Sequence, residues 1–498
     1  MKTAITPTRE EDFPDWYQEV VRVADLAEHA PVRGCMVIKP NGYAIWEIIQ
    51  KEMDARFKEK GVKNAYFPLF IPLSFFEKEA DHVEGFATET AVVTHTRLVK
   101  TQEGKLIPQA PLEEPLVVRP TSEMIIGASF AKWIESYRDL PMKINQWANV
   151  VRWEMRPRLF LRTAEFLWQE GHTAHATQLE ANAMSLEILD LYASFSEEFL
   201  AIPSIKGEKS EGERFPGAVN TYTFEAMMQD GKALQMGTSH YMGTNFAKAS
   251  EIKFLDPEGN LAYAHTTSWG TTTRMIGAVI MTHADDNGLR MPPRIASQQV
   301  VIIPFVMKEE DRKATYEYCN QLQKELSSHA YFGSKIRCFV DEREERAGEK
   351  SWDAVKKGYP IRIEIGPRDI EKGKVLVFLR TKDKKERLEI SRSQVCIQLE
   401  DLLNQVHDEL YQDACSYRES HMVKANSLEE FGAFFKSDQT KNLFVKAPFN
   451  GDRKVEETIR KDYGVTVRCI PFEQSQNRSP CLFTKRPDAK EALFAKSY

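Results

Sequence analysis

The stretch that decides the fold runs from Asn149 to His172 and reads NVVRWEMRPRLFLRTAEFLWQEGH. Apolar and polar residues alternate in two runs, 149–154 and 161–172, which predicts two strands around a basic loop at Pro157. Side chains two apart share one face of a strand. These faces carry charged, aromatic and imidazole groups together: Arg152 and Glu154 in the first run, and Arg162, Phe166, Trp168, Glu170 and His172 in the second. Burying them without partners is unfavourable, so the hairpin predicts a pocket for a charged ligand.

The alternative interpretation is an amphipathic hairpin whose polar face is solvated. Solvation does not explain aromatic rings interleaved with charges on the same face. The order Arg-x-Glu, loop, Arg-Thr-x-Glu-Phe-x-Trp-Gln-Glu-Gly-His resembles motif 2 of the class II aminoacyl-tRNA synthetases, and specifically of the prolyl-tRNA synthetase family. The resemblance covers essentially the whole chain.

The resemblance implies a fold in three parts. Residues 1–290 would form an α+β catalytic domain with an antiparallel sheet, 298–400 an α/β anticodon-binding domain, and 401–498 a small α+β C-terminal domain. The length of 498 residues independently suggests about three domains. Alternating strand and helix patterns over 298–400 also favour a small α/β unit without any appeal to the family.

Composition restricts the class of protein. A hydrophobic content of 42% supports a sizeable core, and 28% charged residues are typical of a soluble protein. The N-terminus has no apolar signal core, and no stretch approaches the length of a membrane span. Seven scattered cysteines indicate reduced thiols in a cytoplasmic protein. The net charge of −6 attracts no nucleic acid globally, so RNA binding requires local basic surface.

A candidate amino-acid site begins at Thr121-Ser122-Glu123, just before an apolar helical run that ends at Trp133. Either hydroxyl could simply be the N-cap of that helix. The resemblance instead implies that Thr121 and Glu123 accept the two N–H donors of proline's secondary ammonium. It also implies a proline pocket that includes the following residues: Arg152, Trp168, Glu170, His172 and His240. The charged, glycine-containing segment 209–222 is a candidate flap over this pocket.

A candidate nucleotide site lies at Ser268–Arg274, SWGTTTR, ahead of an apolar helix at 275–282. Threonines before a helix could be simple caps, yet a helix start beside a guanidinium suits a polyphosphate. The segment resembles class II motif 3, which implies that Thr272 and Arg274 contact ATP. The family likewise places ATP, with Mg²⁺, on these residues: Arg152, Glu154, Arg162, Phe166, Gln235 and Thr238. Arg152 and Arg274 are the expected catalytic residues.

Two segments bear on assembly and subtype. A helix at 42–60 followed by a short strand that stops at Pro68 could be an ordinary capped edge strand. It also resembles motif 1, the dimer element of the family, which implies a homodimer. Fewer than a hundred residues separate His172 from Ser268, and a helix at 178–200 occupies part of them. No room remains for the editing domain that bacterial-type members insert there, so the chain resembles the archaeal/eukaryote-like branch.

The segment 358–369, GYPIRIEIGPRD, resembles part of the anticodon-binding domain. Arg362, Glu364 and Arg368 offer donors and acceptors that suit splayed-out base edges. A solvated strand with paired charges explains each of these residues about equally well.

The C-terminal domain resembles the one specific to this branch, in which the terminal residue packs toward the catalytic domain, so Tyr498 is expected to be ordered. Relatives commonly hold zinc there with four cysteines. This chain has APFNGD at 447–452 and CLFT at 481–484, one cysteine in all, so no zinc is expected. The core predicted from apolar positions is Phe444, Val445, Ile459, Val465, Val467, Ile470 and Phe472.

The resulting prediction is a dimeric enzyme that activates L-proline with ATP and transfers the prolyl group to tRNA(Pro). Two alternatives are an inactive paralogue that binds tRNA or another partner, and a synthetase for a different amino acid. The intact set of Thr121, Glu123, Arg152, Glu154 and Arg274 counts against an inactive copy.

Overall fold

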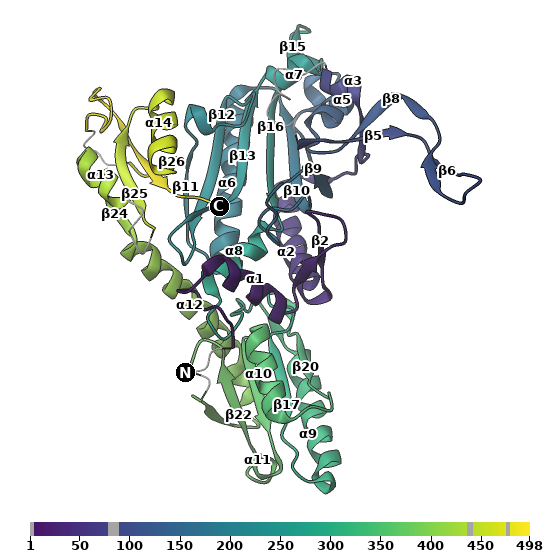
Figure 1. Cartoon of the computed structure of the whole chain (residues 1–498), viewed down its shortest axis with the longest axis vertical. Coiled ribbons are helices and arrows are strands. Elements are labelled where there is room, and N and C mark those ends of the chain that lie inside the picture. Colours follow the sequence, from purple (N-terminus) through teal and green to yellow (C-terminus); the bar gives the residue numbers. More distant parts are fainter. Residues whose placement is uncertain (1–3, 78–88, 384, 436–441, 475–478) are drawn as a thin grey trace.

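The computed structural model describes residues 4–77, 89–383, 385–435, 442–474 and 479–498. A large sheet with its helices, together with the C-terminal module, lies at one end of the elongated molecule, and a five-stranded sheet lies at the other (Figure 1). A long helix, α12 (Val395–Ser420), runs from the five-stranded domain to the C-terminal module. The proposed boundary between residues 400 and 401 lies within this helix.

The catalytic part of the large sheet has seven strands. In spatial order they are β11 (Ser204–Glu208), β12 (Asn220–Met227), β13 (Ala233–Gly243), β16 (His265–Thr272), β10 (Glu165–His175), β9 (Met142–Val151) and β3 (Lys63–Asn64). All neighbours are antiparallel except β3 and β9. The predicted antiparallel sheet is therefore confirmed.

The decisive hairpin differs from its prediction in where the strands end. β9 and β10 pair with Val150 opposite Phe166, but β9 ends at Val151 and β10 begins only at Glu165. The connecting loop is therefore longer than the loop predicted between residues 154 and 161. It places Arg152, Glu154 and Arg162 on the loop instead of on strands.

One face of the sheet is covered by α6 (Gln178–Leu200), which begins at a capping box formed by Thr177 and Glu180. This helix was predicted at 178–200. Trp269 packs on the same side, in edge contact with Tyr192, and a Cβ at Gly171 on the neighbouring strand would overlap its ring. Glycine is needed there because two strands and an indole share the space.

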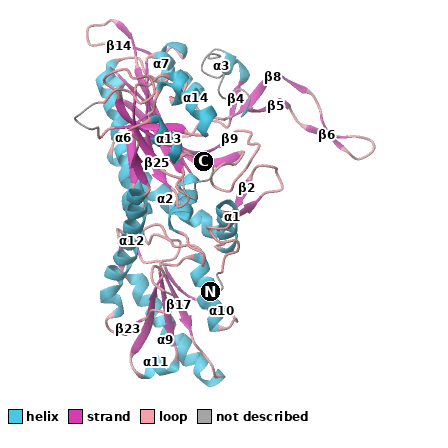
Figure 2. Cartoon of the chain, turned by 60° about the vertical axis from the view of Figure 1, so that its left-hand side comes forward, coloured by secondary structure: helices cyan, strands magenta, loops and turns pink. Residues whose placement is uncertain are grey.

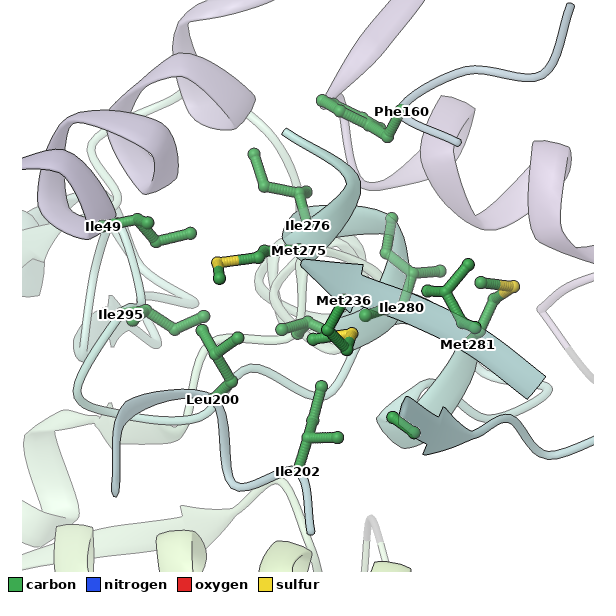
Figure 3. Close-up of a cluster of buried hydrophobic side chains, with 14 of the residues drawn as sticks. Ile49, Phe160, Leu200, Ile202, Met236, Met275, Ile276, Ile280, Met281 and Ile295 are labelled. Atoms are coloured by element: carbon green, nitrogen blue, oxygen red, sulfur yellow. The ribbon is translucent and has the colours of Figure 1, made fainter. Parts of the chain in front are cut away.

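Three further helices pack around the end of the sheet: α1 (Phe13–Val23), α2 (Pro40–Glu59) and α8 (Arg274–His283). Their buried side chains join those of α6 and the sheet in one hydrophobic core. Figure 3 shows Ile276 and Ile280 of α8 beside Met236 of β13, with Leu200 and Ile295 closing the cluster.

Smaller elements complete the catalytic part. They are β1 (Ala27–His29), β2 (Met36–Ile38), β4 (Phe70–Pro72), α3 (Leu73–Glu77), β5 (Ala91–His95), β6 (Leu98–Lys100), β7 (Leu106–Pro108), β8 (Pro111–Val118), α5 (Glu123–Trp133), η2 (Tyr137–Asp139), η3 (Glu211–Glu213), α7 (Asn245–Ala249), β14 (Lys253–Leu255) and β15 (Leu261–Tyr263). The strands β5 to β8 form an arm that projects from the body (Figures 1 and 2).

The second domain is a mixed sheet with the order β20 (Cys338–Val340), β17 (Val300–Pro304), β21 (Ile361–Ile365), β22 (Lys374–Leu379) and β23 (Leu388–Ser391). The first three strands are parallel, and the last two are antiparallel additions. Its other elements are α9 (Glu309–Ser328), β18 (Ala330–Tyr331), β19 (Ser334–Lys335), α10 (Ala347–Lys357) and α11 (Pro367–Glu371). All five residues of β17 are buried, as a central parallel strand requires. The predicted α/β domain is confirmed.

The C-terminal module continues the catalytic sheet. β26 (Thr466–Pro471) pairs with β11 through Gly207–Pro471 and Glu208–Ile470, and β27 (Lys490–Ala495), β25 (Phe444–Phe449) and β24 (Met422–Lys424) follow. The helices are α13 (Leu428–Phe434) and α14 (Arg453–Tyr463).

The predicted core of this module is largely confirmed. Phe444, Val445, Ile459, Val465 and Val467 are buried, and Ile470 is partly buried. Phe472 is 44% exposed, so its prediction was wrong, because β26 ends at Pro471 and the alternation ends with it. Within the described part of the chain, no helix is long and apolar enough to cross a membrane.

Candidate active site

A cavity of about 600 Å³ opens on the sheet face opposite α6, between the 152–164 loop, the start of α5 and the 209–219 loop. Every residue predicted for the amino-acid and nucleotide sites lines it: Thr121, Glu123, Arg152, Glu154, Arg162, Phe166, Trp168, Glu170, His172, Gln235, Thr238, His240, Thr272 and Arg274. They come from the 152–164 loop, β10, β13, β16 and the starts of α5 and α8. The antiparallel sheet thus brings together residues that are far apart in the sequence.

Glu123 stands at the first position of α5 with both carboxylate oxygens engaged. The Thr121 hydroxyl donates to Oε2, and the Ser268 hydroxyl donates to Oε1 at 3.0 Å. Ser122 occupies the N-cap position of α5 but makes no side-chain capping hydrogen bond; its hydroxyl donates to Glu170 at 2.5 Å, and that of Thr121 donates to Glu123. The capping interpretation is therefore wrong, and the Thr121 oxygen keeps lone pairs for a ligand.

Glu170 and His172 form a buried ionic pair on β10. His172 Nε2 lies 3.1 Å from Glu170 Oε2, and Gln146 donates to the other oxygen at 2.5 Å. Burial alone would raise the pKa of Glu170, but its hydrogen bonds with His172, Ser122 and Gln146 hold the pKa below its usual value. Burial opposes a charged His172, yet Glu170 and Glu123 raise its pKa. The pair therefore favours carboxylate and imidazolium.

His240 is a neutral group with both ring nitrogens in use. Nδ1 lies 3.0 Å from the Thr221 hydroxyl and Nε2 lies 3.0 Å from the Thr238 hydroxyl. Burial, with His172 nearby, lowers the pKa of His240 to about 3. The ring of Phe215 packs against the imidazole with centroids 4.5 Å apart. His240 therefore supports the wall of the cavity without supplying charge.

Arg152 is oriented by backbone and aromatic rings. Its Nε donates to the Pro120 carbonyl at 2.9 Å, and its guanidinium lies over Phe166 and Trp168 at 5.7 and 5.5 Å. Burial lowers the pKa of Arg152, and the carboxylates of Glu123, Glu89 and Glu170 oppose the shift.

Arg274, at the start of α8, reaches the opposite part of the cavity. It donates to the carbonyl oxygens of Leu161 and Gln235 at 3.3 Å, and its backbone N–H donates to Thr272 Oγ1 at 3.0 Å. Burial, together with Arg162 and Arg152, lowers its pKa to about 10. The guanidinium is still protonated at neutral pH, so three arginines concentrate positive charge where an anion would lie.

The 209–222 segment, predicted as a flap, lines the cavity with Lys209, Glu213 and Phe215. Sequence reasoning missed the contribution of the C-terminal module, whose Thr466 and Arg468 also line the cavity. A lone arginine within the apolar strand 465–470 was a signal that it has a buried partner.

The C-terminal residue also lines the cavity, as the resemblance implied. The Tyr498 hydroxyl donates to Asp230 at 2.7 Å, and its ring centroid lies 5.0 Å from Lys232 Nζ and 5.9 Å from Arg158 Cζ. Tyr498 is therefore ordered against the catalytic part.

The candidate anticodon residues are not brought together in one site. Arg362 Nε lies 2.9 Å from Glu364 Oε1, and its guanidinium stacks over Phe378 at 4.2 Å. Arg362 lines a second cavity of about 440 Å³ between the two domains, whereas Glu364 accepts from Ser351 at 2.7 Å. Arg368 is exposed on α11.

The residues at the expected zinc position do not fit a zinc ion. Cys481 Sγ lies 3.2 Å from Asn450 Oδ1, and its neighbour in the pattern is Thr484. Among the residues that the structure describes, no three His, Cys, Asp or Glu side chains are grouped as metal ligands. A single thiolate cannot replace the four ligands of a structural zinc site.

Comparisons with known proteins agree with this geometry. The family model of the class II tRNA synthetase core domain (G, H, P, S and T) matches residues 106–283. That of an anticodon binding domain matches 299–402, and that of a prolyl-tRNA synthetase C-terminal domain matches 431–498.

Three curated relatives are similar along their whole length. The chain is 56% identical to a proline–tRNA ligase of Protochlamydia amoebophila, 54% to proline–tRNA ligase 2 of Anaeromyxobacter dehalogenans and 52% to that of Bdellovibrio bacteriovorus. Each match covers 100% of this chain and 99% of the relative.

Proposed function

The chain belongs to the proline–tRNA ligase family of class II aminoacyl-tRNA synthetases, and from this we propose how its residues divide the work. The enzyme activates L-proline with ATP to prolyl-adenylate and transfers the prolyl group to the 3′ end of tRNA(Pro). It is of the type without an inserted editing domain: between β10 and β16 the described chain forms only α6, β11, η3, β12, β13, α7, β14 and β15.

The main support for the amino-acid site is the carboxylate of Glu123 at the N-terminus of α5, which the hydroxyls of Thr121 and Ser268 hold in place. Proline's ammonium has two N–H donors, which suit Glu123 and the Thr121 oxygen. Its carboxylate would then face Arg152. Trp168, Glu170, His172 and His240 form the walls of the pocket, and Glu170 and His172 hold each other in place through their buried contact.

ATP would occupy the part of the cavity between Arg152 and Arg274. Phe166 stacks the adenine, Glu154 accepts from its amino group, and Arg152 contacts the α-phosphate. The remaining nucleotide contacts are Arg162, Gln235, Thr238, Thr272 and Arg274. Mg²⁺ would arrive with ATP and offset phosphate charge, held by the phosphates, by water and by at most one or two of the carboxylates that line the cavity, such as Glu89 and Glu154.

The chemistry requires positioning and charge, and no protein nucleophile. A carboxylate oxygen of proline attacks the α-phosphorus, the bond to the bridging oxygen breaks, and pyrophosphate leaves toward Arg274. Arg152 stabilises the negative charge that accumulates on the α-phosphate in the transition state. The terminal ribose hydroxyl of tRNA then attacks the prolyl carbonyl and releases AMP.

Binding of tRNA and assembly complete the proposal. Arg362, Glu364 and Arg368 are proposed anticodon contacts on the domain whose family model matches 299–402. A homodimer is supported by α2 and β3, where the motif 1-like helix leads into a strand parallel to β9. We place the enzyme in the cytoplasm, where its seven free cysteines stay reduced.

Proline-dependent ATP–pyrophosphate exchange, run with a panel of amino acids, tests the function. We expect exchange with proline well above that with the other amino acids. Exchange with a different amino acid as the best substrate would indicate another synthetase, and exchange with none would indicate an inactive paralogue.

A further inference from the structure

The loop between β11 and β12, residues 209–219, reaches the cavity from the side of the C-terminal module. Its residues Lys209, Glu213 and Phe215 line the cavity. The strand before it, β11, pairs with β26 of the module. After the loop, Tyr222 of β12 packs its ring against Phe472, which follows β26. Both ends of the loop are therefore next to the C-terminal module (Figure 1).

A buried ionic cluster fixes the root of the loop. Lys209 Nζ lies 2.8 Å from Glu225 Oε1, and Arg468 of β26 donates to Glu225 Oε2 from Nε at 3.1 Å and from Nη2 at 2.9 Å. All three side chains are buried, and burial, which would raise the pKa of Glu225, is overcome by the two cations. Removing one partner from such a cluster leaves a buried charge uncompensated, so the three groups hold one another in place.

The tip of the loop rests on α14 of the same module. The short helix η3 contains Gly212, and a Cβ added there would overlap the carboxylate of Glu456. Glu456 is buried on α14. Arg460, one turn further along α14, forms an ion pair with Glu213. A side chain at position 212 would therefore have to displace the buried Glu456 carboxylate or lift the loop from α14.

The inner side of the loop contacts the wall of the amino-acid pocket. The Phe215 ring packs on His240, and the Phe215 N–H donates to the Thr221 hydroxyl at 3.0 Å. The same Thr221 hydroxyl lies 3.0 Å from His240 Nδ1. A displacement of the loop from α14 would thus move Phe215 away from the pocket.

We propose that the C-terminal module clamps the 209–219 loop closed over the amino-acid end of the cavity. Arg468 and Glu225 are positioning residues at the root of the loop, and the packing of Gly212 on Glu456 positions its tip. This rests on the proposed function in one respect, that the pocket beneath the loop takes proline. The clamp keeps the loop ordered before substrate arrives, which removes part of the entropic cost of binding.

The test uses the full-length chain and two variants: one that introduces a steric clash between the loop and α14, and a double variant that removes the clash. Gly212→Ala introduces a methyl group against Glu456, and Gly212→Ala with Glu456→Ala restores the space. Gly212 is not one of the glycines with a positive φ, so its backbone conformation is open to alanine. A second, milder pair reverses charge on α14: Arg460→Glu places a carboxylate beside Glu213, and Lys461→Glu makes the same change at an exposed neighbour as the control.

Hydrogen exchange of peptides covering 209–219 measures opening of the loop without any dependence on activity. We expect faster exchange in Gly212→Ala and, more weakly, in Arg460→Glu, with Lys461→Glu unchanged. The KM for proline in pyrophosphate exchange should rise about 10-fold in Gly212→Ala, as the closed fraction falls, with KM for ATP little changed. Both effects should disappear in the double variant.

Several outcomes would overturn the clamp. One is loop exchange and proline KM equal to those of the wild type in both Gly212→Ala and Arg460→Glu. Another is a double variant as impaired as Gly212→Ala. If Gly212→Ala unfolds the protein throughout, equal loop exchange in Arg460→Glu and Lys461→Glu rejects the clamp. A wild-type enzyme with no proline-dependent exchange would refute the proposed function, while the loop measurements still decide the clamp.

Discussion

The arginines of the active-site cavity and the arginine proposed to read the anticodon are held by different partners. Arg274 donates to the carbonyl oxygens of Leu161 and Gln235, and Arg152 Nε donates to the Pro120 carbonyl. Arg362 is paired with the carboxylate of Glu364 and stacked on Phe378. A carbonyl orients a guanidinium without cancelling its charge, whereas a carboxylate in direct contact neutralises it. The carboxylates of Glu123, Glu89 and Glu170 act on Arg152 but do not outweigh the effect of its burial on its pKa.

This difference separates arginines whose charge is left for a ligand in the cavity from an arginine whose charge is already paired within the protein. Burial of Arg274, and then the nearby charges of Arg162 and Arg152, lower its pKa, so the charged guanidinium is unfavourable there until an anion binds. Arg362 gains its compensation within its own strand. The comparison predicts that arginine substitutions in the two regions affect different measurements.

The largest effect is expected from Arg152→Ala. Loss of a preorganised charge contact to the α-phosphate should reduce the rate of proline-dependent pyrophosphate exchange by about 10²–10³-fold. The thermal unfolding midpoint should change little, because the guanidinium faces the cavity. Arg362→Ala is the matched control in exchange, and a wild-type exchange rate in Arg152→Ala would show that the catalytic arginine has been misassigned.

Arg362→Ala itself should affect stability and tRNA charging. It leaves Glu364, which is mostly buried, without its cation, so the free energy of unfolding should fall by about 3 kcal/mol in urea titrations. Aminoacylation of tRNA(Pro) should fall while pyrophosphate exchange persists. If Arg362→Ala lost exchange as strongly as Arg152→Ala, the two regions would not differ as the comparison requires.

The Glu170–His172 pair is a carboxylate-paired cation inside the cavity, and its effect should depend on pH. The pKa of His172 is raised above its usual 6.5, so its stabilising contribution is complete below that pH and is lost as pH rises through the raised pKa. The pKa of Glu170 is lowered below its usual 4.5, so its contribution is lost only as pH falls through that lowered value.

Urea unfolding of the wild type and His172→Gln across pH measures this contribution. The wild type should be more stable by about 2 kcal/mol between roughly pH 5 and 6.5, with the difference shrinking at higher pH. A difference that stays constant with pH would mean that His172 is neutral in the pair.

The enzyme should discriminate only weakly between proline and alanine, because the contacts to the proline ring are apolar and involve no charge. Alanine lacks methylenes of proline worth roughly 1–3 kcal/mol each, so misactivation of alanine should be measurable. The described chain between β10 and β16 contains no inserted domain to remove the product. Purified enzyme should therefore deacylate alanyl-tRNA no faster than buffer, and rapid deacylation would reveal an editing site.

The C-terminal module should contain no zinc, which would leave its stability to packing around residues such as Phe431 and Phe494. Elemental analysis of protein purified without chelator should find no stoichiometric zinc, and chelation should leave the unfolding midpoint unchanged. Stoichiometric zinc, lost on chelation together with C-terminal structure, would contradict this prediction.

Strand alternation predicted which side chains share a face of the sheet, whereas the family resemblance supplied the assignment of residues to proline and ATP, and that assignment stays a prediction. Phe166, Trp168, Glu170 and His172 follow one face of β10 as expected. The same patterns failed at strand ends, at Val151 and Phe472, where alternation continues in the sequence but backbone pairing stops.

Long-range pairing was beyond the reach of those patterns. Nothing near Glu225 indicates that Arg468 will lie beside it, because their contact depends on the pairing of β11 with β26. Likewise, the sequence left open whether Arg362 and Glu364 pair with each other, and only the distance between their side chains shows that they do.

The single sheet that spans the catalytic part and the C-terminal module has a consequence for synthesis on the ribosome. β11 is made long before β26, so its outer backbone groups lack their strand partner while the rest of the chain emerges. An unpaired strand edge can associate with other chains. Translation that stops before Thr466 would release a protein with that edge open, and we expect such truncated chains to need chaperones more than the complete enzyme does.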